Sequence, residues 1–127
     1  PSLNDRLKSG QWWTQGDLKT DTSSIDKLLQ PFPNTHVQVG WIPDRFPEVG
    51  ERSFRLIHID VDLYEPTRDS LEFFFPRLVP GGVVLLDDHG FVSCPGARKA
   101  AVEYFEEAGL PIIELPTGQA FVIKPPA

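Results

Sequence analysis

The stretch LIHIDVDLYEPTRDS, from Leu56 to Ser70, joins an apolar run to the start of a helix. Its first half is the kind of near-continuous apolar segment that forms a strand buried in a parallel sheet. Pro66 then lies where the first turn of a helix tolerates proline. Apolar residues follow at helical spacing: Leu71, Phe74, Phe75 and Leu78. Because Asp60 and Asp62 stand at the junction, the stretch predicts a strand, an acidic turn and a helix in direct succession.

A second stretch, GGVVLLDDHG from Gly81 to Gly90, repeats this plan. The residues VPGG (79–82) predict a turn, and the apolar run after them predicts a second buried strand that ends in Asp87 and Asp88. From Pro95 to Ala108 an alanine-rich apolar stripe predicts another helix, and Gly109 is placed to stop it. The two acidic pairs therefore occupy equivalent positions, each at the end of a strand and before a helix.

The flanking segments complete the predicted fold. A short helix is expected in SSIDKLLQPF, capped by Ser23 or Ser24 and stopped by Pro31, and a short strand is expected at HVQVGW (36–41). PIIEL (111–115) and QAFVIK (119–124) are separated by only three residues and must pair as an antiparallel hairpin. We therefore expect one α/β domain of 127 residues, a loop over 1–22 and a core over 23–124. The core would be a mostly parallel sheet with an antiparallel C-terminal strand.

The two acidic pairs predict a ligand site. Ligands bind beyond the carboxyl ends of strands in open parallel sheets, and both pairs lie at such ends. Carboxylates this close raise one another's pKa, and a hard divalent cation such as Mg²⁺ or Ca²⁺ relieves the repulsion. The alternative is that these aspartates only cap the following turns and helices. His89 is a candidate acid/base group or ligand, or an ordinary loop histidine, whereas His58 is interpreted as a core residue and Cys94 as structural.

Composition excludes several classes of protein. A net charge of −6 without a basic run argues against a nucleic-acid partner. No apolar run approaches the ~18 residues of a membrane span. The single cysteine, Cys94, cannot form an internal disulfide, which fits a reducing, cytoplasmic location.

The series HIDVDLYEPTRDSLEFFFPRLVPGGVVLLDDHG, CPGARKAAVEYF and LPTGQAFVIK resembles the macrocin O-methyltransferase (TylF-like) family. The resemblance extends from about Gly16 to Lys124 and implies a Rossmann-like fold, S-adenosylmethionine and Mg²⁺ as cofactors, and methylation of a hydroxyl on a sugar or natural-product-like small molecule. It further implies Asp60, Asp87 and Asp88 as metal ligands and Asp62 as the general base, although Asp60 and Asp62 could exchange roles. Asp17 and Leu18 would lie near the adenine of the cofactor.

The sequence departs from this family in its first third. No two glycines stand in G-x-G spacing, although such methyltransferases hold their cofactor with a glycine-rich turn after the first strand. Two central strands, expected between segments 36–41 and 54–60, are missing with it. The resemblance therefore implies a truncated chain, the C-terminal part of an enzyme, which should be inactive in isolation.

A sheet that lacks two central strands should have an unpaired edge. We expect a homodimer or association with a missing N-terminal half, unless segment 36–41 pairs directly with 54–60 inside one chain. Two other functions remain open: a non-enzymatic oligomeric remnant or binding module, and a glycosyltransferase that binds a metal through D-x-D. A nucleotide-sugar assay and a cofactor-binding assay would separate these functions.

Overall fold

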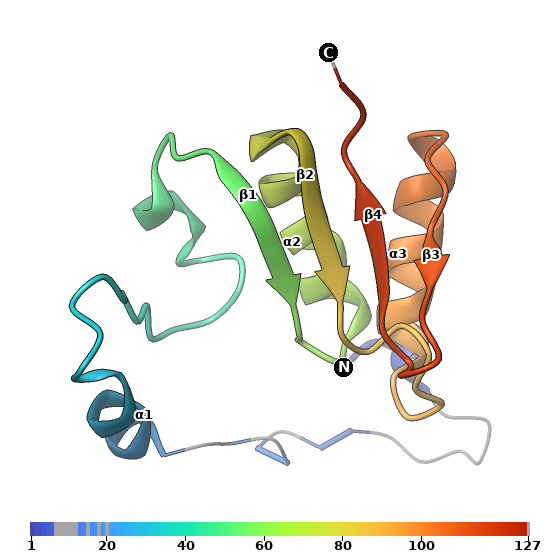
Figure 1. Cartoon of the computed structure of the whole chain (residues 1–127). Coiled ribbons are helices and arrows are strands. Elements are labelled where there is room, and N and C mark those ends of the chain that lie inside the picture. The colour runs from blue at the N-terminus through green and yellow to red at the C-terminus, as the bar shows by residue number, and fades with distance from the viewer. Residues whose placement is uncertain (7–12, 15, 18, 20, 127) are drawn as a thin grey trace.

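The computed structural model describes residues 1–6, 13–14, 16–17, 19 and 21–126. Its centre is a four-stranded sheet of order β1-β2-β4-β3 (Figure 1). The strands are β1 (Phe54–Ile59), β2 (Leu78–Leu86), β3 (Ile113–Glu114) and β4 (Ala120–Ile123). β1 and β2 are parallel, and β4 is antiparallel to both β2 and β3. The predicted α/β class and the C-terminal hairpin are therefore confirmed.

Two helices, α2 (Tyr64–Phe74) and α3 (Pro95–Glu107), lie behind the sheet in Figure 1. α2 carries Pro66 in its first turn and gives way to a 3₁₀ turn, η3 (Phe75–Arg77), at Pro76, because proline cannot continue the hydrogen-bond ladder of an α-helix. α3 begins with Pro95 and is followed by Gly109 at φ 66°, a left-handed conformation that glycine adopts without strain. No helix in the described part of the chain is long and apolar enough to cross a membrane.

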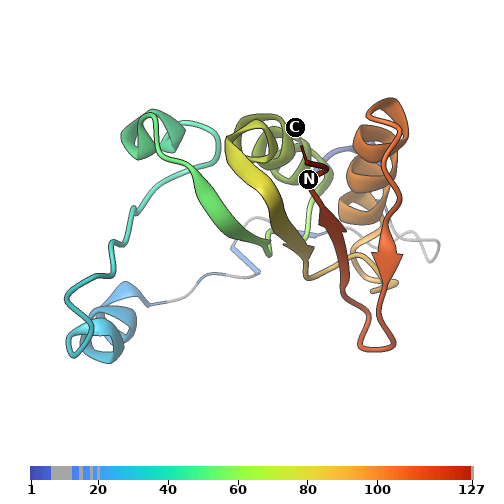
Figure 2. The same cartoon turned by 45° about the horizontal axis from the view of Figure 1, so that its top comes forward.

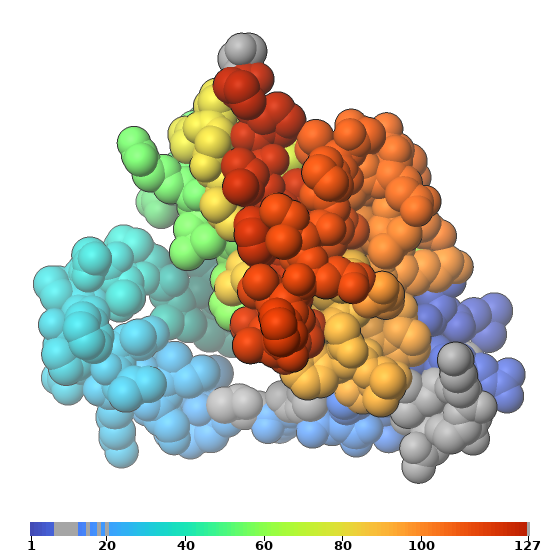
Figure 3. Space-filling model, turned by 45° about the vertical axis from the view of Figure 1, so that its right-hand side comes forward, coloured from blue at the N-terminus to red at the C-terminus, as the bar shows by residue number. Residues whose placement is uncertain are grey.

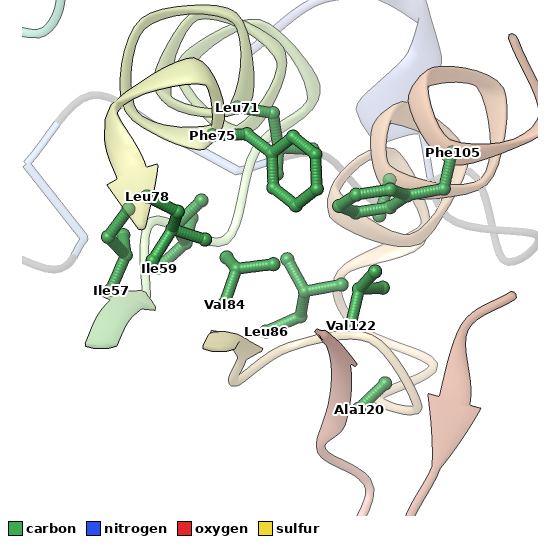
Figure 4. Close-up of a cluster of buried hydrophobic side chains, with 11 residues drawn as sticks. Ile57, Ile59, Leu71, Phe75, Leu78, Val84, Leu86, Phe105, Ala120 and Val122 are labelled. Carbon is green, nitrogen blue, oxygen red and sulfur yellow. The ribbon is translucent and has the colours of Figure 1, made fainter. Parts of the chain in front are cut away.

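The core fills the space between these helices and the sheet (Figure 4). The rings of Phe75 and Phe105 meet edge-on with centroids 5.2 Å apart. Alternate residues of β2 and β4 point toward these rings, and two of them, Val84 and Val122, are each 1% exposed. Burial of each such side chain stabilises the fold by about 1.5–3 kcal/mol. This layer fixes the strands whose ends carry the aspartates.

The opposite face of the sheet has no helix over it in the described part of the chain (Figure 2). Cross-strand register places Leu56, Val83 and Ile123 in one row of this face, with Leu56 63% and Ile123 49% exposed. His58, Leu85 and Phe121 form the next row. The outer edge of β1 pairs with no strand in the described residues, since β1 is the first strand of the sheet order.

Among its described residues, the N-terminal third contributes three short elements: η1 (Leu3–Asp5), α1 (Thr22–Leu29) and η2 (Phe46–Val49). α1 contains no buried residue, and in Figure 3 it projects from the body, coloured light blue to cyan. η1 is different, because its Asp5 is 1% exposed and accepts a hydrogen bond from the backbone N–H of Tyr64 at the start of α2. Part of the expected N-terminal loop therefore belongs to the packed domain.

Three local predictions were wrong. Segment 36–41 forms no strand, and all six of its residues are exposed. A strand needs a partner for its backbone groups, and this segment pairs neither with the free outer edge of β1 nor with another described segment. Asp21, rather than Ser23 or Ser24, caps α1 by accepting the N–H of Ser23 at 3.1 Å. The VPGG segment does not precede β2 but forms an irregularity inside it, where the register with β1 shifts.

Candidate active site

The carboxyl ends of β1 and β2 bring the acidic pairs together. Ile59 pairs with Leu86 in the parallel register, and the N–H of Asp87 donates to the carbonyl of Ile59 at 2.9 Å. Asp60 and Asp87 therefore leave the sheet at the same level. The sequence predicted that each acidic pair ends a strand, and the pairing of β1 with β2 makes the two strand ends neighbours.

The first group, which we call the outer cluster, consists of His58, Asp60 and Asp87. One ligand atom from each lies within 4.8 Å of the others. Nε2 of His58 is 3.0 Å from Oδ1 of Asp87, and the same oxygen accepts a hydrogen bond from Nε2 of Gln119 at 2.7 Å. The bond from Gln119 lowers the pKa of Asp87, while burial, followed by the charges of Asp87 and Asp62, raises the pKa of Asp60. The outer cluster is open to solvent, so a ligand can reach it.

The second group, the inner cluster, consists of Asp62, Asp88 and Cys94, whose ligand atoms also lie within 4.8 Å of one another. Asp62 has φ 58°, and Leu63 N–H donates to the carbonyl of Val61 at 2.6 Å, which makes Asp62 the centre of a tight γ-turn. Such a conformation is strained for a residue with a side chain and is common at functional sites. The turn directs the N–H of Asp62 to Oδ2 of Asp88 at 2.9 Å.

The electrostatics of the inner cluster follow from its burial. Asp88 is 8% exposed, and this burial raises its pKa to about 6. Cys94 is 3% exposed, its Sγ donates to Oδ1 of Asp62 at 3.3 Å, and burial raises its pKa to about 12. A carboxyl group with a pKa near neutrality can both hold and release a proton, which suits proton transfer.

His89, the candidate acid/base residue, belongs to neither cluster. Its Nε2 contacts Oε1 of Glu114 at 3.1 Å, and Arg98 donates to the same oxygen at 2.6 Å. His89 is 2% exposed, and burial lowers its pKa. Its Nδ1 has no hydrogen-bond partner among the described residues, and His89 lines a cavity of about 10 Å³ together with Thr67 and Asp88. That volume is about the size of one water molecule, so a water can connect His89 to the inner cluster.

The β3–β4 hairpin carries Gln119 to the outer cluster because two glycines allow close backbone contact. Gly90 N–H donates to the carbonyl of Gly118 at 2.6 Å. A Cβ at Gly90 would lie 2.8 Å from both Cα and O of Gly118, which is too close for any side chain. The loop after Asp88 and the hairpin turn therefore lie directly against each other.

The residues expected as one metal set are thus divided between the two clusters. Asp60 and Asp87 lie in the outer cluster, whereas Asp88 lies in the inner cluster with Asp62. Asp17, expected near a cofactor, accepts the N–H of Thr14 at 2.7 Å in a local exposed turn. Leu18, its expected companion, lies outside the described residues.

Sequence reasoning missed three residues of the site. His58, interpreted as a core residue, has an exposed side chain, because β1 is buried on one face only and His58 alternates with the buried Ile57 and Ile59. Cys94, interpreted as structural, touches Asp62. Gln119 donates a hydrogen bond to Asp87 although the two residues are 32 positions apart in the sequence. No local pattern in the sequence indicates that contact.

A groove runs beside the outer cluster. It has a volume of about 470 Å³ and lies between segment 38–49 and β1, with Ile42, Phe46 and Leu56 in its walls and His58 and Asp60 at its rim. Pockets of this size hold small organic ligands, and a mostly apolar wall with a few polar groups is typical of them. The site therefore combines an open carboxylate cluster with room for a small molecule.

Known proteins resemble this chain in sequence. The family model described as Macrocin-O-methyltransferase (TylF) matches residues 26–115. The chain is 40% identical over 78 residues to the 8-demethyl-8-(2,3-dimethoxy-alpha-L-rhamnosyl)-tetracenomycin-C 4'-O-methyltransferase of Streptomyces olivaceus, a match that covers 60% of this chain and 29% of that protein. It is 30% identical over 98 residues to the mycinamicin III 3''-O-methyltransferase of Micromonospora griseorubida, covering 74% of this chain and 37% of that protein.

Solved structures agree on the fold. The O-methyltransferase NovP aligns with 98% of this chain and 53% of its own, with a TM-score of 0.76 and 23% identity. The calicheamicin methyltransferase CalS11 aligns with 64% of this chain and 32% of its own, with a TM-score of 0.54 and 29% identity. The aligned part of the curated relatives is thus well under half of their length.

Proposed function

The chain belongs to the macrocin-O-methyltransferase (TylF) family, and on that basis we propose that it is the carboxylate-bearing part of an S-adenosylmethionine-dependent O-methyltransferase. The observation that carries the proposal is the meeting of two acidic pairs at the ends of β1 and β2. Two relatives are named for methylation of a sugar-bearing tetracenomycin and of a mycinamicin. The substrate proposed here is accordingly a hydroxyl of a sugar or a natural-product-like small molecule, and the groove beside the outer cluster has room for part of it.

Methyl transfer to a hydroxyl requires removal of one proton. The hydroxyl oxygen forms a bond to the methyl carbon, the bond from that carbon to the sulfonium sulfur breaks, and the O–H proton passes to a base. Asp62 is the proposed base, because the γ-turn projects it next to Asp88, a carboxyl group whose pKa is already about 6. His89 and a water in the small cavity can relay that proton from the inner cluster.

Mg²⁺ is the proposed metal. Asp60 and Asp87 of the outer cluster would hold it, and Asp88, which lies in the inner cluster, would join them as third ligand only after a change in its side-chain position. The donor set fits, because Mg²⁺ prefers carboxylate oxygens and keeps other positions for water or substrate. Asp60 and Asp87 are close together, and their mutual repulsion, which adds to the effect of burial on the pKa of Asp60, would be relieved by a cation. A bound divalent ion would lower the pKa of a hydroxyl coordinated to it.

Calorimetric titration with Mg²⁺ or Mn²⁺ tests the metal site. Asp87→Ala should weaken binding at least tenfold, or about 1.4 kcal/mol. Asp44→Ala is a matched control, because Asp44 is exposed and lies outside both clusters. Equal affinity in Asp87→Ala and Asp44→Ala would contradict the ligand assignment.

The roles of Asp60 and Asp62 can be separated in the same way. If Asp60 is a ligand and Asp62 the base, Asp60→Asn weakens metal binding and Asp62→Asn leaves it within about twofold. The reverse result would exchange the two roles. Both variants keep a polar side chain of the same size, so a general loss of folding is not expected.

The 127-residue chain alone is proposed to be inactive. It contains no G-x-G spacing, and the backbone of such a turn is what approaches the cofactor closely in Rossmann-like folds. Measurable transfer of a labelled methyl group from S-adenosylmethionine to any sugar hydroxyl by this chain would refute that proposal.

Binding of a nucleotide sugar, with no affinity for S-adenosylmethionine, would favour the glycosyltransferase alternative, and affinity for neither would favour a binding module.

A second copy of the chain is the proposed partner. The outer edge of β1 pairs with no described strand, and the uncovered sheet face beside it exposes Leu56 and Ile123. Edges and apolar faces of this kind recruit another chain, and a two-fold pair is the simplest closed arrangement. Light scattering at micromolar concentration should show a dimer that Leu56→Lys dissociates, while Leu28→Lys on the exposed face of α1 has no effect. A 14.3 kDa monomer would contradict the dimer and leave the missing N-terminal half as the proposed partner.

A further inference from the structure

His89 is a buried residue whose two ring nitrogens have different surroundings. It follows Asp88 in the loop after β2 and is 2% exposed. Its Nε2 lies 3.1 Å from Oε1 of Glu114 on β3, whereas its Nδ1 has no hydrogen-bond partner among the described residues. A neutral imidazole carries one N–H and one lone pair, so the partner of Nε2 decides which of the two Nδ1 presents.

Glu114 can only accept a hydrogen bond at this position. Arg98, near the start of α3, donates to the same oxygen at 2.6 Å. The hydrogen bonds from His89 and Arg98 lower the pKa of Glu114, and an ionised carboxylate has no proton to donate. Burial lowers the pKa of His89, which keeps the imidazole neutral at pH 8. The single proton of the ring therefore lies on Nε2, and Nδ1 presents a lone pair.

The small cavity beside His89 supplies a place for the partner of that lone pair. Thr67 and Asp88 also line it, and Glu114 does not, so Nδ1 is the ring nitrogen that can serve this space. Neither neighbour can donate to Nδ1, because the hydroxyl of Thr67 already donates to the carbonyl of Leu63 at 2.7 Å and a carboxylate has no proton. The cavity volume of about 10 Å³ is enough for one water molecule, which can donate.

We propose that Glu114 is a positioning residue for the inner cluster: it keeps the proton of His89 on Nε2, and Nδ1 consequently holds a buried water that links His89 to Asp88. The proposal deepens the proposed function and rests on it for its role in proton transfer, in which Asp62 acts beside Asp88. With Nδ1 as acceptor, the water donates one hydrogen to His89 and the other to Asp88. The opposite tautomer would place the lone pair of Nε2 against the carboxylate of Glu114, which is repulsive.

Nitrogen-15 NMR of the metal-free 127-residue chain at pH 8 tests the tautomer, because protonated and unprotonated ring nitrogens have well-separated shifts. The chain has three histidines, and His89→Gln assigns the signals of His89 by their loss. The wild type should show His89 protonated on Nε2 only, with an N–H that exchanges slowly with solvent because the residue is buried.

Glu114→Leu removes the acceptor of that N–H. A buried N–H without a partner is costly, so the proton should move to Nδ1 in about half of the molecules or more. Glu107→Leu is the matched control, because Glu107 is also an exposed glutamate paired with an arginine, Arg68, at 2.8 Å. The control should leave the ring of His89 unchanged. Protonation of Nδ1 in the wild type, or a ring that Glu114→Leu does not alter, would overturn the proposal.

The water is detected in the same wild-type sample. Magnetisation should pass from water to the ring of His89 and to the methyl group of Thr67, and not to the methyl groups of Val122, which is 1% exposed in the apolar core. Absence of transfer to both His89 and Thr67 would overturn the proposal.

None of these measurements needs a metal or a cofactor, so they are independent of the tests of the proposed function. If the tautomer behaves as expected while Asp87→Ala leaves Mg²⁺ binding unchanged, the proposed metal site fails and the positioning of His89 by Glu114 stands. If Mg²⁺ binding depends on Asp87 while Glu114→Leu does not alter the ring of His89, the metal site stands and the proposal about Glu114 fails.

Discussion

Replacement of Asp5 by alanine should destabilise the whole domain. Asp5 is 1% exposed, and its Oδ1 accepts the N–H of Tyr64 at 2.7 Å. Tyr64 is the first residue of α2, and the preceding Leu63 provides no side-chain cap. Asp5 therefore caps α2 from a distant part of the sequence, and it does so next to the Asp60–Asp62 turn.

The size of the effect follows from the lost interactions. A hydrogen bond to a charged group contributes about 1.5–3 kcal/mol, and its loss leaves a buried N–H without a partner. A carboxylate at the N-terminus of a helix adds about 0.3–1 kcal/mol. Asp5→Ala should thus lower the free energy of unfolding by about 2–4 kcal/mol. Asp5→Asn keeps an oxygen that can accept the Tyr64 N–H and should lower it by about half as much.

Urea denaturation followed by circular dichroism measures this change through the transition midpoint at constant slope. Asp26→Ala is the control, because Asp26 is an exposed acid on α1. A loss of less than about 0.5 kcal/mol for Asp5→Ala, comparable to an ordinary surface substitution, would refute the reasoning. It would mean that η1 leaves the body of the domain in solution.

Four further outcomes are expected. Phe105→Ala should lower the free energy of unfolding by about 3–5 kcal/mol, measured by the same denaturation, because Phe105 is 0% exposed and borders Phe75 in the core. Gly90→Ala should displace the hairpin turn, since its Cβ would meet Gly118, and amide spectra should show shifts around Gln119 with weaker metal binding; unaltered spectra would contradict this. Cys94 should react with iodoacetamide far more slowly at pH 8 than in urea, because burial raises its pKa to about 12. That raised pKa also predicts that the free energy of unfolding falls above about pH 9, where only the unfolded thiol ionises, and that Cys94→Ala lacks this fall.

The sequence predicted those helices, strands and turns whose formation depends mainly on residues close together in the chain. The apolar run and the acidic end of β1, the proline in the first turn of α2 and the three-residue link of the hairpin each constrain their own neighbourhood. Strand pairing then followed from chain connectivity, because a helix between two strands favours a parallel pair. For these reasons the α/β class and the meeting of the acidic pairs could be predicted.

The features that were missed depend on partners far away in the sequence. His58 was interpreted as a core residue because an apolar run suggests burial on both faces, whereas only one face of β1 is covered in the structure. HVQVGW has the composition of a strand, but a groove separates its second half from β1, and the segment does not pair with the free edge of that strand. Asp5 caps α2 across 59 positions, a contact that no short motif indicates. Composition and spacing describe what a segment can do, and the tertiary neighbours decide which of those possibilities is realised.

Because Gln119 holds Asp87, the outer cluster can be complete only after the ribosome has synthesised Gln119. His58, Asp60 and Asp87 are all synthesised before the hairpin that holds Gln119 and before β4, which covers the second edge of β2. A nascent chain that stops short of β4 has the aspartates without the strand and the amide that orient one of them. Domains tend to fold as units once their sequence has emerged. The outer cluster therefore takes its final form only once β4 has been synthesised and paired with β2.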